Sequence, residues 1–410
     1  MTVPISPPRP SSPRATVFQR VLLVVLSPIV FLALLEGGIR LSGISTDLAR
    51  NRNFKVAVPT WLLADPGWVR GQQRRMDTRG PVRAEDVAWF GHFEEARYVG
   101  LKLRPHLDVR VVNPFNDIEV GKQATFRITS NGDGFRGPEF NAKSPAVLRV
   151  AAIGDSSTFG WGVDPEYTYE ELLTRRLSSG SRRAEVFNLG MPGTTTRHGL
   201  GVLQHFVAPL KPDVLIVSFG ANDARLALIP AEQELAADDT WLGATRWALL
   251  RFQTFRLARR LIFTWYDPFN AARQKAEDSS LRPLVKAVPL ADYASNLRRL
   301  RGRATVVGAK TVFLSVCTPD EYVAQMRETA EKLRVPFVDA GSIFREKIDD
   351  IVAGKVYPAE LEFYKNLYGV DAMKDNWRLY VTTDGCHPNR VGQSLIADAL
   401  ADAVRSVVSR

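Results

Sequence analysis

The stretch Leu148-Arg-Val-Ala-Ala-Ile-Gly-Asp-Ser-Ser157 decides the fold of this 410-residue chain. Its nearly continuous apolar run is typical of a strand that is buried on both faces, and the run leads into a Gly-Asp-Ser turn. Ser156 therefore follows the carboxyl end of a strand, where open α/β sheets bind their ligands. The stretch predicts a reactive hydroxyl at the edge of a parallel sheet.

Strand and helix patterns alternate from residue 147 onward, which indicates a parallel sheet covered on both faces. Strands are predicted at 148–153, 184–189, 213–219, 311–317 and 335–339, and helices near 166–178, 196–207, 291–301, 321–333 and 390–408. Right-handed crossovers between five such strands predict a flavodoxin-like, three-layer α/β/α sandwich with strand order 2-1-3-4-5. Residues 224–290 interrupt the alternation and are predicted to be an insertion.

Two other predicted strands also end in residues that suit an oxyanion. Strand 184–189 leads to Gly193, whose backbone N–H can turn toward a ligand because glycine has no Cβ. Strand 213–219 leads to Asn222 in Gly-Ala-Asn-Asp, which brings a side-chain amide to the same edge. Together with the N–H of Ser156, these groups predict three donors for an oxyanion.

Asp384-Gly-Cys-His387-Pro388 places a carboxylate and an imidazole three residues apart, at the start of the last predicted helix. A hydroxyl, a base and an orienting acid are the parts of a serine-hydrolase triad. The alternative is that Ser156 only caps a helix and that His387 is a surface histidine. The order of the motifs, each placed after a predicted strand or before a helix, favours the triad.

These motifs resemble the four blocks of the SGNH hydrolases, the GDSL esterase and lipase superfamily, over roughly residues 147–410. The resemblance implies the three-layer α/β/α fold and the cleavage or transfer of an acyl group carried on oxygen. The residues to which it gives roles are the nucleophile Ser156, the oxyanion-hole donors Ser156, Gly193 and Asn222, the base His387 and its orienting carboxylate Asp384.

The first 45 residues differ from the rest of the chain. A Pro- and Ser-rich start with three arginines precedes the apolar run 21–35, which residues through Gly43 extend to about the 20 residues of a membrane span. A cleaved signal peptide and a buried core helix are alternatives, but no small-residue cleavage site follows the run. We expect an uncleaved, single-pass signal anchor, with the amino terminus in the cytoplasm and the body outside it.

Residues 46–146 are predicted to form a small β-rich lead-in, with strands near 107–112 and 123–129. The turn-rich segment 130–138 follows them. It is either a plain connector or a loop that lays Phe135 and Arg136 beside the mouth of the active site.

Charge and composition exclude several classes of protein. The net charge of +10 favours anionic surfaces, but the basic residues are scattered and no nucleic-acid motif is present, so no nucleic-acid partner is expected. With five histidines and no His-Glu-x-x-His pattern we expect no metal and no other cofactor, and His198 and His205 are expected to be solvated. Cys317 and Cys386 are either two free thiols, which is marginally favoured, or a disulfide that fixes the histidine loop.

Apolar residues recur at helical spacing through 241–266, and five arginines lie among them. Three interpretations stay open. The segment is an amphipathic helix on a membrane, a cap over the crevice that binds an acidic substrate, or a helix packed on the domain with its arginines in water.

The leading functional hypothesis is a membrane-anchored serine esterase or O-acyltransferase that acts on an O-acyl group, chiefly acetyl, of a carbohydrate or polysaccharide. The alternatives are a lipase or lysophospholipase that acts on membrane lipid esters, and a non-catalytic binding protein with the same fold.

Overall fold

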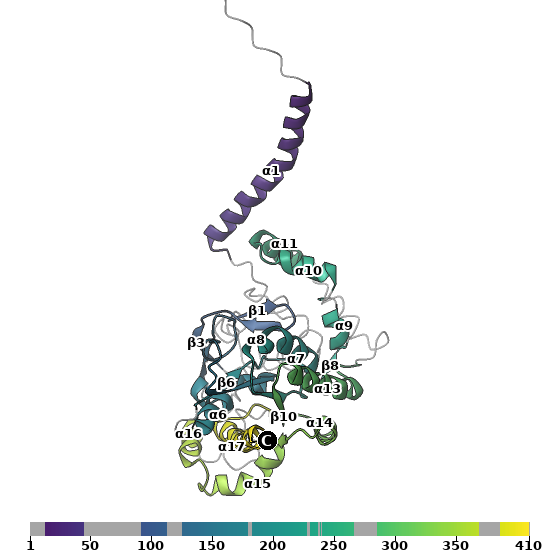
Figure 1. Ribbon diagram of the computed structural model, residues 1–410. Helices are drawn as coiled ribbons and strands as arrows, with labels where there is room; N and C mark the ends of the chain where they lie inside the picture. The colour runs from purple at the N-terminus through teal and green to yellow at the C-terminus, as the bar shows by residue number, and fades with distance from the viewer. Residues whose placement is uncertain are drawn as a thin grey trace, which may run out of the picture.

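Five parallel strands form the central sheet of the computed structural model, in the order β11-β10-β7-β5-β6 (Figure 1). The structure describes residues 13–44, 92–112, 125–178, 183–227, 230–236, 238, 240–265, 285–368 and 386–409. The strands are β5 (Val147–Gly154), β6 (Arg183–Asn188), β7 (Val214–Ser218), β10 (Lys310–Ser315) and β11 (Phe337–Asp339). The predicted strands and the predicted 2-1-3-4-5 order are confirmed.

Helices cover both faces of the sheet because its strands are apolar on both faces. Along β7, Leu215 and Val217 belong to one hydrophobic core, and Val214 and Ile216 belong to the other. The first core packs against α7 (Thr196–Val202), α13 (Leu290–Val306) and α14 (Asp320–Leu333). The second packs against α6 (Tyr169–Leu177), α15 (Ala340–Val352), α16 (Pro358–Tyr368) and α17 (Arg390–Val408). The predicted three-layer α/β/α sandwich is thereby confirmed.

Short elements complete the sandwich. They are α5 (Ser156–Phe159), the 3-10 turn η4 (Pro165–Tyr167), the π-helical turn η5 (Leu203–Val207) and α8 (Ala208–Leu210). The predicted helix 196–207 thus runs through α7 and η5, and changes its hydrogen-bonding pattern on the way.

The β-rich lead-in consists of two antiparallel pairs among the described residues. One pair is β1 (Phe93–Ala96) with β2 (Gly100–Leu103), and the other is β3 (Asp108–Val112) with β4 (Thr125–Thr129). The second pair matches the two strands predicted there, whereas the first was not predicted. Phe93, Leu103 and Phe126 are buried in the same core as the α7 face of the sheet, so the lead-in packs directly on the sandwich.

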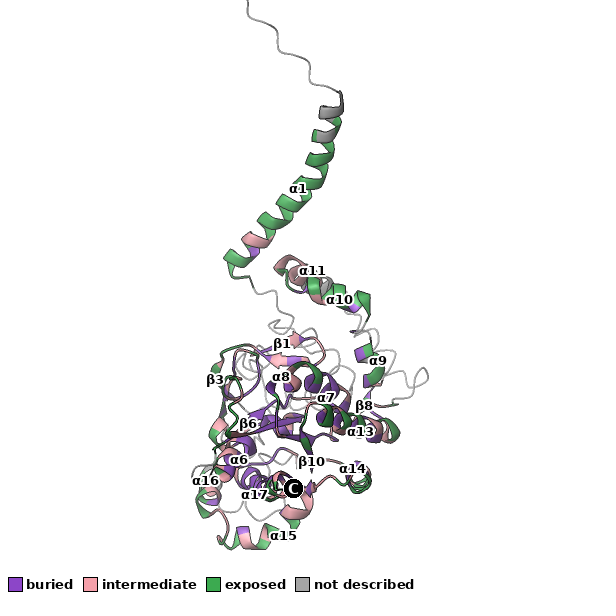
Figure 2. Ribbon diagram, viewed as in Figure 1, coloured by how far each residue is buried: buried purple, intermediate pink, exposed green. Residues whose placement is uncertain are grey.

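Helix α1 (Pro13–Ser42) extends away from the sandwich, and nearly all of its described side chains are exposed (Figure 2). Its Gln19–Ser42 segment is long and apolar enough to cross a membrane, a property that an N-terminal signal sequence shares. Only the end of α1 that is nearest the sandwich is partly covered. There Ile39 is buried, and α1 contacts α11.

The insertion differs from the single helix predicted over 241–266. It contains α9 (Ala231–Ala236), α10 (Trp241–Leu249), α11 (Gln253–Trp265) and the small pair β8 (Leu226–Ala227) with β9 (Val285–Lys286). The chain leaves the helical path between α10 and α11. There Nε of Arg256 donates to the carbonyl of Leu250 at 2.6 Å, and the Glu36 carboxylate caps the first turn of α11. These side-chain contacts replace the backbone hydrogen bonds that a continuous helix would make at this point.

Candidate active site

Ser156 begins the short helix α5 directly after β5, as the sequence predicts. Close packing requires a glycine at position 154, directly before Asp155 and Ser156. A Cβ on Gly154 would lie 2.0 Å from Oγ1 of Thr158 and 2.5 Å from the carbonyl oxygen of Ser218. Only glycine therefore lets the end of β5 run tightly beside β7 and still turn into α5.

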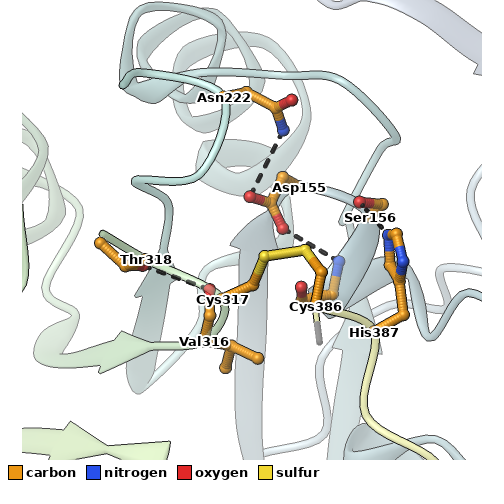
Figure 3. The surroundings of a disulfide bond; sticks show 9 residues. Asp155, Ser156, Asn222, Val316, Cys317, Thr318, Cys386 and His387 are labelled. Atoms are coloured by element: carbon orange, nitrogen blue, oxygen red, sulfur yellow. Dashed lines mark hydrogen bonds between the residues drawn. A yellow bond between two sulfur atoms is a disulfide. The ribbon is translucent and has the colours of Figure 1, made fainter. Parts of the chain in front are cut away.

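Asp155 holds the turn as the cap of α5. Its carboxylate accepts the backbone N–H of Ser157 at 2.9 Å, and Nδ2 of Asn222 lies 3.4 Å from its other oxygen (Figure 3). Burial raises the pKa of Asp155 to about 6, although these hydrogen bonds and the nearby His387 act in the opposite direction. Asp155 therefore positions the serine turn and ties it to the Asn222 loop.

His387 reaches the serine from the last loop of the chain. Its Nε2 lies 2.8 Å from Oγ of Ser156, and its side chain is largely buried (Figure 3). Asn389 follows and caps α17 by accepting two backbone N–H groups of the first turn. Asp384, the predicted orienting carboxylate, lies outside the described residues, so its role stays a prediction.

The histidine loop is also fixed covalently. Cys386, the neighbour of His387, forms a disulfide with Cys317 at the end of β10, with a Cα–Cα distance of 4.5 Å. The alternative of two free thiols, which the sequence marginally favoured, is wrong. The bond joins two segments 69 residues apart, and it anchors the loop that carries the imidazole to the sheet.

Gly193 lies in a loop that is tied to the same edge of the sheet. Its φ of +78° is in the left-handed region that favours glycine. The loop is held because Nδ2 of Asn188 donates to the carbonyl of Thr158 at 2.8 Å, and Oγ1 of Thr194 donates to the carbonyl of Gly154 at 3.0 Å. The three predicted donor residues therefore all lie in loops at the carboxyl ends of β5, β6 and β7.

The two histidines of the α7 region do not share one environment. His198 was expected to be solvated, but it is buried: its Nδ1 lies 2.9 Å from Oγ1 of Thr195, in the cap of α7, and burial lowers its pKa to about 3. His205 is exposed and stacks on Tyr98, with ring centroids 3.9 Å apart. Among the residues that the structure describes, no cluster of three or more His, Cys, Asp or Glu side chains suits a metal ion.

Arg136 lies beneath the serine helix and not at the mouth of the site. Both Phe135 and Arg136 are buried, which corrects the interpretation that segment 130–138 lays them beside the opening. The guanidinium donates to the carbonyls of Arg127 (2.8 Å), Phe159 (2.8 Å), Gly160 (2.6 Å) and Val163 (2.5 Å). Two of these carbonyls belong to the end of α5 and its C-cap, so Arg136 fixes the helix that begins with Ser156.

Buried carboxyl groups near this region make stability depend on pH. Burial raises the pKa of Glu170 to about 8 and that of Asp223 to about 7. A raised pKa in the folded state means that the stabilisation from these protons is complete below the ordinary carboxyl range and is lost as pH rises through about 7 and about 8. Each group should lower the free energy of unfolding by about 1.4 kcal/mol per pH unit between the ordinary carboxyl pKa of about 4 and its own raised pKa.

Urea unfolding of the Glu170→Gln variant at a series of pH values tests this expectation. The free energy of unfolding of the variant should no longer fall between about pH 7 and about pH 8, where only Glu170 titrates. Glu171→Gln, which alters the exposed neighbour on the same helix, should keep it. Equal slopes for wild type and Glu170→Gln would contradict the assignment.

A serine and a histidine lie in hydrogen-bond contact at the edge of a three-layer α/β/α sheet, the arrangement that serine hydrolases use. The chain belongs to the GDSL-like lipase/acylhydrolase family, whose sequence model matches residues 152–395.

Named relatives match only part of this region. The chain is 30% identical over 94 residues to esterase TesA of Pseudomonas aeruginosa, which is 22% of this chain and 47% of that protein. It is 30% identical over 83 residues to an arylesterase of Vibrio mimicus, which is 20% of this chain and 42% of that protein. The chain thus spans less than half the length of these curated relatives. The crystal structure of the psychrotrophic esterase EstA from Pseudoalteromonas sp. matches 64% of this chain and 100% of its own, with 14% identity and a TM-score of 0.36.

Proposed function

We propose that the protein is a membrane-anchored serine esterase or O-acyltransferase that acts on O-acyl groups, chiefly acetyl, of a carbohydrate or polysaccharide. The observation that carries the catalytic part is the 2.8 Å contact between Oγ of Ser156 and Nε2 of His387. A histidine at this distance is within reach of the serine proton, and neutral imidazole is a competent base near pH 7.

The reaction starts when His387 takes the proton from Ser156 as the serine oxygen bonds to the acyl carbon. The carbonyl oxygen becomes an oxyanion that accepts hydrogen bonds from the N–H groups of Ser156 and Gly193 and from the Asn222 amide. As the tetrahedral intermediate collapses, His387 returns the proton to the leaving alcohol, and an acyl-enzyme remains on Ser156. Asp384 orients the imidazole and stabilises its charged form.

Water or a sugar hydroxyl completes the cycle. The acceptor loses its proton to His387 as it attacks the acyl carbon, and the proton returns to Ser156 when the bond to the serine oxygen breaks. Hydrolysis gives a free acid, whereas a sugar acceptor gives a new ester. Two features support a carbohydrate ester as substrate. The apolar helix α1 and segment 131–137 both resemble those of membrane-attached superfamily members, and some proteins of this superfamily act on O-acetyl groups of extracytoplasmic polysaccharides.

A lipid ester is the second candidate, and the exposed apolar side chains of α10 favour it, because such side chains suit a lipid surface. The full-length chain, purified in detergent, should therefore be offered acetylated oligosaccharides and lysophosphatidylcholine side by side. Release of acetate without release of fatty acid supports the carbohydrate assignment. Release of fatty acid alone overturns it, and labelling of Ser156 by a fluorophosphonate would still identify the nucleophile.

Asn222→Ala tests the oxyanion hole separately from the nucleophile. The loss of one donor to an oxyanion lowers kcat by about 10²- to 10³-fold, because the hydrogen bond is strongest in the transition state. We expect this loss for acetyl-ester hydrolysis, with little change in KM. Since Asn222 also contacts Asp155, Asn222→Asp is the matched variant of similar size. It lacks the donor and should be at least as slow, and near-normal activity in either variant would remove Asn222 from the hole.

A further inference from the structure

The end of α1 nearest the sandwich is hydrogen-bonded to the insertion through Glu36 and Arg40, and we call this set of contacts the Glu36 clasp. The Glu36 carboxylate accepts the backbone N–H groups of Gln253 and Thr254, each at 2.9 Å, and the hydroxyl of Thr254 at 3.1 Å. Arg40 donates to Glu36 at 2.7 Å and to the carbonyl of Arg251 at 3.2 Å. Glu36 is therefore the N-terminal cap of α11, supplied by a helix 217 residues away in the chain.

This clasp sets the depth at which α11 begins. Arg20 and Glu36 are separated by about 24 Å of helix, at about 1.5 Å per residue. The hydrocarbon core of a bilayer is about 30 Å thick, so an α1 centred in it holds each of these charged residues about 3 Å inside an edge, where its side chain can reach the interface. Because Glu36 caps the first turn of α11, Phe252, which directly precedes that helix, lies at the same edge.

The side chains around this point are apolar and exposed. On α10, the exposed fractions are 75% for Trp241, 60% for Leu242 and 39% for Leu249, and Phe252 between the two helices is 50% exposed. Leu249 follows Leu242 by seven residues and Trp241 by eight, so the three side chains lie within about 100° of one another around α10. Figure 1 draws α10 and α11 between the end of α1 and the sandwich, across the direction of α1. Trp side chains of this kind are typical of the membrane–water interface.

Three of the five arginines in segment 241–266 are engaged within the protein. Arg246 donates to Asp238 at 2.7 Å, Arg256 donates to the carbonyl of Leu250, and Arg259 pairs with Glu95 of β1. These three charges are therefore not free to bind anionic lipid, which weakens the interpretation of the segment as a basic membrane helix. The ion pair between Arg259 and Glu95 links α11 to the lead-in.

We propose that α10 and α11 form an interfacial platform, in which Trp241, Leu242, Leu249 and Phe252 insert into the headgroup region of the bilayer that α1 spans. This inference rests on the membrane-anchored part of the proposed function. The platform and the Glu36 clasp together give the catalytic domain two attachments to one membrane surface. They fix its distance from that surface and its tilt, which a single flexible tether would leave free. The ester-hydrolase site is thus held near the membrane at a constant height.

Fluorescence quenching in phosphatidylcholine vesicles tests the platform. The full-length chain carries one introduced, NBD-labelled cysteine, at Leu242→Cys on α10, at Leu34→Cys on α1 or at Val306→Cys on α13; its own two cysteines are paired. Val306 is the matched control, because it is 86% exposed and lies on the sandwich. Lipids with a nitroxide close to the headgroup should quench the label at 242 about threefold more than the label at 306, without anionic lipid.

The outcomes separate the platform from the anchor. Deep nitroxides should quench the label at 34, which reports the span itself. Quenching at 34 with none at 242 would overturn the platform and leave the anchor and the esterase assignment intact. No quenching at 34 would remove the anchor and the platform together. Glu36→Leu, which keeps α1 apolar but removes the cap, should reduce quenching at 242 and not at 34, whereas unchanged quenching at 242 would refute the clasp.

Discussion

Ser156→Ala should abolish ester hydrolysis while the protein stays folded. Removal of the nucleophile of a serine hydrolase lowers kcat by about 10⁴- to 10⁶-fold, because the remaining donors only stabilise attack by water. Oγ of Ser156 contacts Nε2 of His387, and the backbone N–H that serves as an oxyanion donor is unchanged by the substitution. Hydrolysis of p-nitrophenyl acetate by the full-length chain measures the loss, and thermal unfolding shows whether the fold is kept.

Ser157→Ala is the control for this experiment, because it removes the adjacent hydroxyl from the same short helix. Its activity should stay within about tenfold of wild type, since its backbone N–H still donates to Asp155. Similar losses in both variants would mean that the turn, and not the hydroxyl of Ser156, supports the reaction. Retained activity in Ser156→Ala would exclude Ser156 as the nucleophile.

The sheet and the placement of Ser156 at its edge followed from the sequence because their signals are local. A buried apolar run of strand length, followed by a glycine-containing turn, predicts both the strand and the residue at its end. Repeated after β5, β6 and β7, this pattern predicted that Ser156, Gly193 and Asn222 share one edge. That Ser156 and His387 meet was predicted from the resemblance to the family's motifs, because nothing local to either residue encodes their contact.

The features that the sequence did not settle depend on contacts between distant segments. The break between α10 and α11 is associated with Glu36, which lies 217 residues before Gln253, so the local helical pattern does not reveal it. The disulfide needed Cys317 and Cys386 to be adjacent in space, which spacing alone does not fix. His198 has the same residue type as the exposed His205, and only the packing of α7 against its neighbours buries it.

Arg136 illustrates the same limit. Arginine in a turn-rich segment is usually exposed. Here four carbonyls converge on the guanidinium, and the ones at Phe159 and Val163 lie 23 to 27 residues further along the chain. Above about pH 8, where Glu170 ionises, its buried carboxylate adds a countercharge that partly offsets the burial of Arg136. This arrangement predicts that substitution of Arg136, which is not part of the Ser156–His387 pair, greatly lowers the stability of the fold.

Arg136→Met should destabilise the protein by about 3 to 5 kcal/mol, because it leaves four carbonyls without their buried, charged donor. In a domain of this size we expect the thermal midpoint to fall by about 10 °C. Arg127→Met is the control. Its guanidinium pairs with Asp108 at the exposed surface, so its loss should change stability little. Urea unfolding of the two variants, measured side by side, gives the comparison.

Two further variants decide whether the guanidinium acts as argued. Arg136→Lys keeps the charge but lacks the planar fork, so it should recover only part of the lost stability. Above about pH 8, where Glu170 ionises, adding Glu170→Gln to Arg136→Met removes the buried carboxylate that the first change leaves without a countercharge. At that pH the double variant should be less destabilised than the sum of the single changes. If Arg136→Met unfolded no more easily than Arg127→Met, the converging carbonyls would contribute nothing, and α5 would have to be held by its packing alone.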